Sequence, residues 1–423
     1  MTRRGLGVVI AVGVLAHLIA TVAGPARLEP LEPSEIARHL NAGDGFVFEQ
    51  YGATYRAWKE PLFPVGLAAL QRVAGQSDTP IRLAQAFFGI ATVVGVWWLG
   101  LRLLGDARRA TLAGVLAALN PFLLYYDTRW VHPLSFDTVL FVLVVAAQLV
   151  AFRAATWRSR LLAGLALGLG LWERTTLWAI AIGLWCAGLV FGPSVRRRTT
   201  LISAAVSLSL GLAVFSPWLI RNARLFGRVI VTTDAAHILW LGNNPWSNGT
   251  YSTDAGKRVF YVADPAFQRS IVGQPELVQH DRFLAAAKQF IAEDPIRFIR
   301  LSLRRAWAFL CFSPNVGVQY TETQRVGYRV VYSVVLLLGF VGAGRWWRRA
   351  TREQRQDGLL VAASLIALAA VHAVMAINLK HRVPFELILS LFAASGVIDA
   401  VSRRRPCTPA ELAVPMPREE RVA

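Results

Sequence analysis

Long apolar runs separated by short polar segments dominate this sequence. The runs 5–24 and 358–377 reach the ~20 apolar residues that a helix needs to cross a bilayer. Similar runs recur at 80–104, 109–126, 131–152, 159–173, 175–191, 200–219, 327–344 and 384–401. The pattern predicts an all-α polytopic membrane protein with about 10–13 transmembrane helices.

Two further apolar stretches are predicted to lie at the membrane surface rather than to cross it. The stretch 61–75 is short for a span, at about 15 residues. The stretch 294–312 contains four arginines, Arg297, Arg300, Arg304 and Arg305. An amphipathic basic helix lies more easily in the interface than across the hydrocarbon core.

The charge distribution indicates how the chain is oriented. The 45 Lys and Arg residues against 26 Asp and Glu give a net charge of +19. The basic residues gather in short linkers, at 3–4, 102–109, 153–160, 196–198, 345–355 and 403–405. Cytoplasmic loops carry such an excess, so the charge reports topology and not a nucleic-acid partner. Segments 25–79, 127–130, 219–326 and 378–383 are then predicted to lie outside.

This map predicts one transmembrane domain over 1–401 and a disordered cytoplasmic tail over 402–423. The outer face carries a first loop at 25–79, with juxtamembrane helices, and a large loop at 219–326. The first apolar run lacks a small-residue cleavage site, so we expect a retained helix. Cys186, Cys311 and Cys407 are scattered, and no Asp/Glu/His cluster suggests a metal. We expect neither a metal nor another cofactor.

Motifs in the two outer loops carry a family resemblance. The first loop contains Glu32, Ile36–Ala37, Gly43, Gly45–Phe46, Gly52–Ala53–Thr54 and the sequence PLFP at 61–64. The second contains Pro217–Trp218, Arg221–Asn222 and the sequence LGNNP at 241–245. In this order, over about 5–400, they resemble the glycosyltransferase family 39, aminoarabinose-transferase-like and protein-O-mannosyltransferase-like enzymes of the C-type glycosyltransferase superfamily.

The resemblance implies a fold and a reaction. Such enzymes move a sugar from a polyprenyl-phosphate carrier to a hydroxyl of a protein, lipid or glycan on the outer face of the membrane. The alanine and arginine richness suggests a GC-rich bacterium, and hence the inner membrane with a site facing the periplasm or exterior. A transporter or flippase of lipid-linked sugars is the alternative, which would place ionisable groups within the spans.

This chemistry needs a base for the acceptor hydroxyl and a cation for the departing phosphate. The resemblance implies Glu32 as the catalytic base, with Glu29 or Glu35 as alternatives. Glu32 could equally be a solvated carboxylate at a helix N-terminus, where the helix dipole favours it.

Three basic residues are candidates for the donor phosphate, namely Lys59, Arg221 and Arg382. Pro217–Trp218 are expected to end a spanning helix, which places Arg221 and Asn222 outside at headgroup depth. The alternatives are an interfacial anchor for Arg221 and a snorkelling lysine for Lys59. Arg174 is also predicted to lie outside.

The resemblance implies a second acid near His132, where this chain has none. Asp127 is the candidate substitute as a second catalytic acid. Sugar or acceptor contacts are expected from Glu60, His132, Asn222, Asn243 and Asn244. The sequence around Asn243 and Asn244 is also good turn chemistry, so both interpretations stay open.

Overall fold

The structure is a computed structural model that describes residues 2–192, 194–312 and 320–403. Of the predicted tail 402–423, residues 404–423 lie outside the described residues. Within the described ranges, seven helices are long and apolar enough to cross a membrane. They are α1 (Thr2–Val22), α4 (Asp78–Leu104), α7 (Leu134–Ala154), α10 (Ser194–Phe226), α16 (Glu322–Arg349), α17 (Arg352–Val374) and α18 (Val383–Arg403).

Shorter helices account for the remaining apolar runs. They are α5 (Ala107–Ala118), α6 (Pro121–Arg129), α8 (Trp157–Glu173) and α9 (Leu177–Phe191). The run 109–126 is therefore divided between two helices. The side chain of Asn120 accepts hydrogen bonds from the amides of Phe122 and Leu123, at 3.0 and 3.1 Å, and Pro121 follows it. Asparagine and proline in this order start a new helix. The predicted all-α polytopic fold is confirmed.

Helix α10 corrects the prediction that Pro217–Trp218 end a spanning helix. The helix continues through Pro217 to Phe226. Proline has no amide to bond the carbonyl four residues earlier, which is that of Ala213. The hydroxyl of Ser216 donates to this carbonyl at 2.8 Å instead. The polar segment that follows therefore begins after Phe226 and not at 219.

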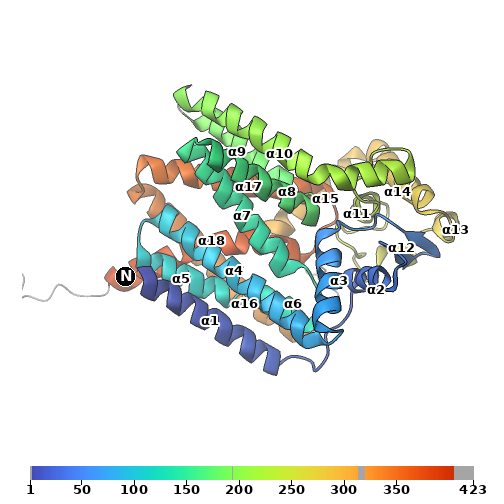
Figure 1. Cartoon of the computed structure of the whole chain (residues 1–423), viewed down its shortest axis with the longest axis horizontal. Coiled ribbons are helices and arrows are strands. Elements are labelled where there is room, and N and C mark those ends of the chain that lie inside the picture. The colour runs from blue at the N-terminus through green and yellow to red at the C-terminus, as the bar shows by residue number, and fades with distance from the viewer. Residues whose placement is uncertain (1, 193, 313–319, 404–423) are drawn as a thin grey trace, which may run out of the picture.

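The outer elements come from both predicted loops and from the short outer segment 378–383. They are α2 (Glu32–Ala42), β1 (Phe48–Gln50), β2 (Ala53–Tyr55), α3 (Leu62–Ala74), α11 (Asp234–Gly242), α12 (Val259–Val262), α13 (Pro265–Ile271), α14 (Glu276–Glu293), α15 (Pro295–Leu310) and the 3-10 helix η1 (Leu379–Arg382). Figure 1 shows α2, α3 and α11 to α14 gathered at one end of the helix bundle, with the N-terminus of α1 at the other end. Two loops far apart in sequence thus form one outer layer.

The two strands form an antiparallel hairpin that packs against the second loop. Phe48 pairs with Tyr55, and the two turn residues, Tyr51 and Gly52, both have positive φ, at 48° and 69°. Such a turn matches the twist of a two-residue hairpin. The amide of Gly273 donates to the carbonyl of Tyr51 at 2.8 Å. This bond ties the hairpin to the α13–α14 connection.

Helix α15 is amphipathic in the way that its sequence predicts. Ile296, Leu303 and Trp307 are exposed, at 71%, 66% and 62%. Arg305 is buried and donates to the carbonyls of Ala373 and Gly242, at 2.7 and 2.5 Å. One side of the helix is thus hydrogen-bonded to the rest of the protein, while the opposite side exposes apolar side chains. This is expected of a helix at the membrane surface.

Candidate active site at the outer ends of the helices

A short backbone pairing positions the first outer loop. The amide of Glu29 donates to the carbonyl of Arg129 at 2.8 Å, and the amide of Val131 donates to the carbonyl of Glu29 at 3.0 Å. Helix α2 begins three residues later, with Glu32 as its first residue. The bond pair therefore brings Glu32 toward the turn that joins α6 to α7, where His132 lies.

A lysine–aspartate pair joins the two outer loops. The ammonium group of Lys59, just before α3, lies 2.5 Å from a carboxylate oxygen of Asp234, the first residue of α11. The amide of Thr233 donates to the carbonyl of Ala57 at 2.8 Å, which fixes the two backbones beside the pair. Asp234 is 8% exposed and Lys59 is 29% exposed. The lysine is therefore the member of the pair that an incoming ligand can reach.

Electrostatics keep both members of this pair charged. Burial lowers the pKa of Lys59, but the carboxylates of Asp234 and Glu32 outweigh it, so the pKa rises above its ordinary value. Burial raises the pKa of Asp234, but Lys59 and His237 lower it by more. The aspartate charge persists down to the acidic range and the lysine charge persists into the alkaline range. The pair stays ionised between those limits.

Glu32 is the acid of its loop that faces these cations. Its charge acts on both Lys59 and Lys380. By contrast, Glu35 accepts a hydrogen bond from the amide of Glu49 at 2.9 Å and so anchors the hairpin. The backbone of Glu29 makes the pairing described above. Of the three acids considered from the sequence, Glu32 is the one whose charge acts on both lysines, and its part as the base stays a prediction.

His132 is buried at the centre of this group and contacts Lys380. Its Nδ1 accepts the amide of Leu134 at 3.0 Å, and its Nε2 lies 2.9 Å from Nζ of Lys380. Burial, followed by the charges of Lys380 and Arg174, lowers the pKa of His132 well below its ordinary value. His132 is therefore held as a neutral imidazole between the backbone of α7 and the side chain of Lys380.

Glu60 and Arg174 complete the cluster on its α8–α9 side. Glu60 accepts from the amide and hydroxyl of Thr175, at 3.0 and 2.8 Å. Arg174 pairs with Asp137, which is 7% exposed, while the arginine side chain is 26% exposed. As with Lys59, the cation is more accessible than its acid. Tyr251 lies within reach of the same charges. Burial, together with the charge of Asp234, raises the pKa of the Tyr251 hydroxyl.

The structure gives Asp127 an internal role and does not place it in this cluster. Asp127 is 1% exposed, lies 3.0 Å from Nε2 of His17 on α1, and accepts from the hydroxyl of Ser135. The side chain of Gln85 donates to the carbonyl of Asp127 and accepts from the amide of His132. Asp127 therefore ties α1 and α4 to the α6–α7 turn. Its burial argues against the predicted part as a second catalytic acid.

Arg382 is likewise engaged inside the protein, contrary to its predicted contact with the donor phosphate. It is 1% exposed, and Nε donates to Glu386 at 3.0 Å. Its other nitrogens donate to the hydroxyl of Tyr328 and to the carbonyl of Cys311. A guanidinium in this position has no surface to offer a lipid phosphate. It fixes η1, and with it Lys380, to α16 and α18.

The three asparagines expected to contact sugar serve the backbone instead. Asn222 donates to the carbonyls of Ile230 and Val231, at 2.9 and 3.1 Å. Asn243 donates to the carbonyls of Leu239 and Val374, both at 2.8 Å. Asn244 donates to Trp240 at 2.7 Å and caps the turn after α11. All three are at most 1% exposed. The turn interpretation of the sequence accounts for Asn243 and Asn244, and Asn222 ties the end of α10 to the segment that follows it.

Arg221 lies in a separate open groove beside the hairpin. The groove has a volume of about 530 Å³, and Arg56, Arg221 and Arg224 line it. The guanidinium of Arg221 stacks on Trp218, 4.6 Å from the ring centroid, and donates to Asn222 at 2.7 Å. The charges that act on Arg221 are those of Glu276 and Arg56, not those of the cluster. Its contact with the donor phosphate stays a prediction.

Sequence reasoning missed three members of the cluster, Asp234, Tyr251 and Lys380. Asp234 and Tyr251 belong to a loop where acids and aromatics are common, and no local pattern distinguishes them. Lys380 stands two residues before Arg382, in a segment that the sequence did single out. Within the described residues, no group of three or more His, Cys, Asp or Glu side chains could hold a metal ion. Independence of a metal stays a prediction.

Comparison with known proteins bears on the first half of the chain. The family described as dolichyl-phosphate-mannose-protein mannosyltransferase matches residues 59–220. The family resemblance drawn from the sequence is confirmed. Lys59, His132 and Arg174 lie inside the segment that matches this mannosyltransferase family, whereas Glu32, Asp234 and Lys380 lie outside it. The match supports a membrane glycosyltransferase.

Two solved structures of low sequence identity align with most of this chain. ArnT from Cupriavidus metallidurans bound to undecaprenyl phosphate is similar with a TM-score of 0.46 and 14% identity, over 93% of this chain and 78% of that one. The same protein in the apo state gives 0.42 and 15%, over 92% and 77%. No curated protein matches the chain. The family resemblance therefore rests on residues 59–220.

Proposed function

We propose that this protein moves a sugar from a polyprenyl-phosphate-linked donor to a hydroxyl acceptor at the outer face of a bacterial inner membrane. The observation that carries the proposal is the accessible cation Lys59, which is backed by buried Asp234 and on which the charge of Glu32 acts. The matched family is named for a lipid-phosphate-linked sugar donor. An acid and a cation are the two groups that this reaction needs.

The proposed reaction assigns one role to each of these residues. The acceptor oxygen attacks the anomeric carbon while the bond from that carbon to the phosphate oxygen breaks. Glu32 takes the proton of the acceptor hydroxyl. The polyprenyl phosphate leaves as an anion, and Lys59 stabilises its charge, with Arg174 as the second accessible cation. Glu60, which lies next to Lys59 in the chain, is the candidate for binding the sugar or acceptor.

The donor tail sets how much of the lipid the protein must recognise. Burying a prenyl chain in the bilayer stabilises it by roughly 0.8 kcal/mol per methylene. The tail can therefore stay in lipid while the protein binds only the phosphate and sugar. The acceptor class, whether protein, lipid or glycan, is left open by this proposal, as is the sugar.

The alternative of a lipid-linked-sugar transporter has one supporting observation. His17 and Asp127 form a buried pair within the helices, as ionisable groups on a transport pathway do. However, both carboxylate oxygens of Asp127 are bonded, and the pair anchors the α6–α7 turn. Its partners account for it without a pathway, so we favour the transferase.

Two substitutions separate chemistry from donor binding. Glu32→Gln should abolish sugar transfer, measured by mass spectrometry of surface glycans and glycolipids from a complemented deletion strain. It should leave binding of undecaprenyl phosphate to the purified protein unchanged. Lys59→Met should weaken that binding. Glu35→Gln and Lys257→Met are matched controls, since Glu35 binds the hairpin and Lys257 is exposed in the outer loop.

The possible results distinguish the roles. Full transfer activity in Glu32→Gln would remove Glu32 as the base. Undecaprenyl phosphate binding equal to that of the wild type in Lys59→Met would remove Lys59 from the donor site. A deletion strain that retains every glycan but accumulates a lipid-linked sugar would favour transport over transfer.

A further inference from the structure

A pocket lies at the end of the bundle that the charge pattern assigns to the cytoplasm. It has a volume of about 440 Å³ and is bounded by the end of α9, the end of α16 and the beginning of α17. Its lining residues are Phe191, Trp347, Leu359, Arg352, Glu353, Arg355 and Gln356. The basic linker 345–355 forms its rim, so the pocket is far from Glu32 and Lys59 along the membrane normal. The proposed transferase site makes no use of it.

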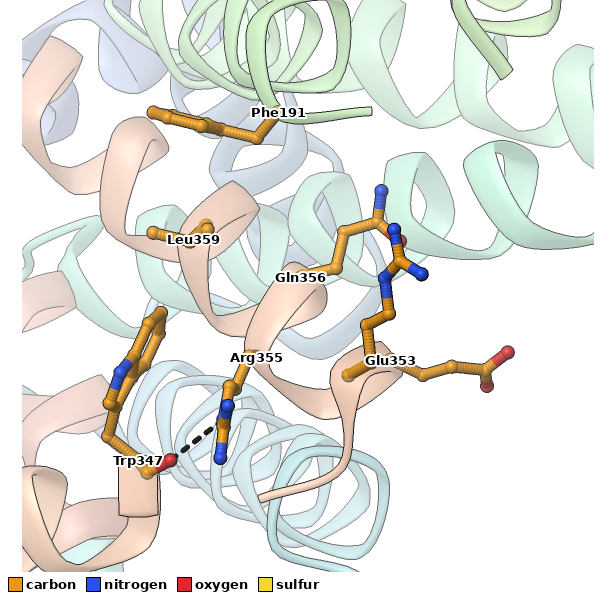
Figure 2. Close-up of a pocket in the computed structure, with 7 residues that line it drawn as sticks. Phe191, Trp347, Glu353, Arg355, Gln356 and Leu359 are labelled. Atoms are coloured by element: carbon orange, nitrogen blue, oxygen red, sulfur yellow. Dashed lines mark hydrogen bonds between the residues drawn. The ribbon is translucent and has the colours of Figure 1, made fainter. Parts of the chain in front are cut away.

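The pocket changes from charged to apolar with depth. Helix α17 begins at Arg352 and enters the bundle, and Leu359 follows seven residues later. At ~1.5 Å per residue, Leu359 lies about 10 Å further along the helix. Figure 2 shows Leu359 on the side of Phe191, with Arg355 nearer the end of α16. Phe191 and Trp347 are 56% and 41% exposed and can contact acyl chains.

Arg355 is held in position by the end of α16. Its Nε donates to the carbonyl of Trp347 at 2.8 Å, as Figure 2 shows, and its Nη2 donates to Arg348 at 3.3 Å. The guanidinium also lies 5.8 Å from the centroid of the Trp347 ring. These contacts fix the direction of the side chain and leave Nη1 without a hydrogen bond among the described residues. A fixed guanidinium loses little entropy on binding an anion.

The two arginines of the rim are not paired with the one acid that lines the pocket, Glu353. Among the described residues, neither Arg352 nor Arg355 forms an ion pair. Glu353, the acid of this turn, is 75% exposed and lies 3.5 Å from Arg153. In Figure 2 its side chain points away from Trp347 and Leu359. The rim therefore has two arginines against one carboxylate, which faces Arg153, and the first turn of α17 adds the positive end of a helix dipole.

We propose that this pocket binds the phosphate of an anionic phospholipid of the cytoplasmic leaflet. Arginine donors match a phosphodiester at headgroup depth, and basic pockets between transmembrane helices on this side of a membrane bind anionic lipid headgroups. The apolar wall formed by Phe191 and Leu359 suits the acyl chains of such a lipid. A soluble phosphate compound would leave this wall in contact with water.

The test is lipid binding to the purified full-length protein, measured by native mass spectrometry. Phosphatidylglycerol is the probe, with phosphatidylcholine as the neutral lipid and inorganic phosphate as the soluble anion. The wild type should retain phosphatidylglycerol over phosphatidylcholine, and millimolar phosphate should not displace it. Arg352→Gln combined with Arg355→Gln should weaken retention at least about ten-fold. Arg158→Gln, at an exposed arginine of another cytoplasmic turn, is the matched control and should retain the lipid.

Each result decides the proposal. Equal retention of phosphatidylglycerol by the wild type and the double variant would overturn it. An equal loss in Arg158→Gln would overturn it as well, because it would show a diffuse surface charge effect. Displacement by inorganic phosphate would show a soluble-anion site instead. If the double variant unfolds in detergent, Arg352→Gln alone carries the same test, since the side chain of Arg352 has no hydrogen bond or ion pair within the described residues.

Discussion

At the scale of single residues, the candidate site follows one rule of placement. Two cations of the site each have a more deeply buried acid behind them, as Lys59 has Asp234 and Arg174 has Asp137. The acid keeps the cation charged and fixes its direction, while the cation faces the position where a phosphate would lie. Glu32 is separate from these pairs, which suits a proton acceptor.

The contribution of the Lys59–Asp234 pair to stability can be measured separately from the contribution of Lys59 to donor binding. Lys59→Met should lower the free energy of unfolding by about 1–3 kcal/mol, because it leaves Asp234 buried with only His237 as a partner. Adding Asp234→Asn should recover most of that stability without recovering undecaprenyl phosphate binding. Thermal unfolding in detergent measures the first effect and native mass spectrometry the second. Recovery of binding in the double variant would assign Lys59 a structural role only.

Arg382 is expected to matter for stability. Arg382→Met leaves Glu386 buried without its cation, so unfolding should become easier by about 3–5 kcal/mol. Undecaprenyl phosphate binding by the fraction that remains folded should change little. Glu386→Gln in the same background should restore part of the stability. A variant that is stable but has lost donor binding would instead support the phosphate contact.

At the scale of elements, close helix packing decides where side chains can stand. Helices α16 and α18 approach each other at Gly342, where an added Cβ would clash with the carbonyl oxygen of Phe392. Small residues at such contacts let backbones approach closely in membrane helices. Because η1 leads directly into α18, this contact also helps to place Lys380.

Gly342→Ala is expected to destabilise the protein by about 1–3 kcal/mol, since the two helices must move apart. Gly344→Ala is the matched control on the same helix, because nothing lies within 4 Å of the Cβ that it would add. The control should be neutral or slightly stabilising. Thermal unfolding of the two variants in detergent is the measurement. Equal stability of both would contradict the close contact between α16 and α18.

At the scale of the whole molecule, the bundle has two chemically different ends. The outer end gathers both long loops with the acid–cation cluster, whereas the other end has the basic linkers and the pocket at Arg352 and Arg355. This separation places the proposed sugar transfer and the proposed lipid contact on opposite membrane faces.

Sidedness can be measured by cysteine labelling in intact cells. In a background with Cys186, Cys311 and Cys407 replaced by serine, a membrane-impermeant maleimide should label Thr54→Cys without lysis. Arg108→Cys should react only after lysis. Both positions are exposed, Thr54 in the outer hairpin and Arg108 at the start of α5. The opposite labelling pattern would reverse the orientation and move the cluster to the cytoplasmic face.

The sequence by itself determined the membrane character, the apolar runs and the family resemblance. Hydrophobic length and the placement of arginine carry this information locally, because a bilayer imposes the same constraint on every span. The sequence also selected Glu32, Lys59 and His132, which the structure brings into one cluster. Pro217 wrongly predicted the end of a helix. The helix continues because the hydroxyl of Ser216 donates to the carbonyl of Ala213, which the proline cannot bond.

Only the tertiary structure decided which polar residues face a ligand and which serve the fold. Lys59 meets Asp234 across 175 positions of sequence, and no local pattern encodes that pairing. Arg382, Asp127 and Asn243 looked like site residues because their types suit the chemistry. Buried partners from distant helices engage them instead, since a polar group removed from water must find a partner inside the protein.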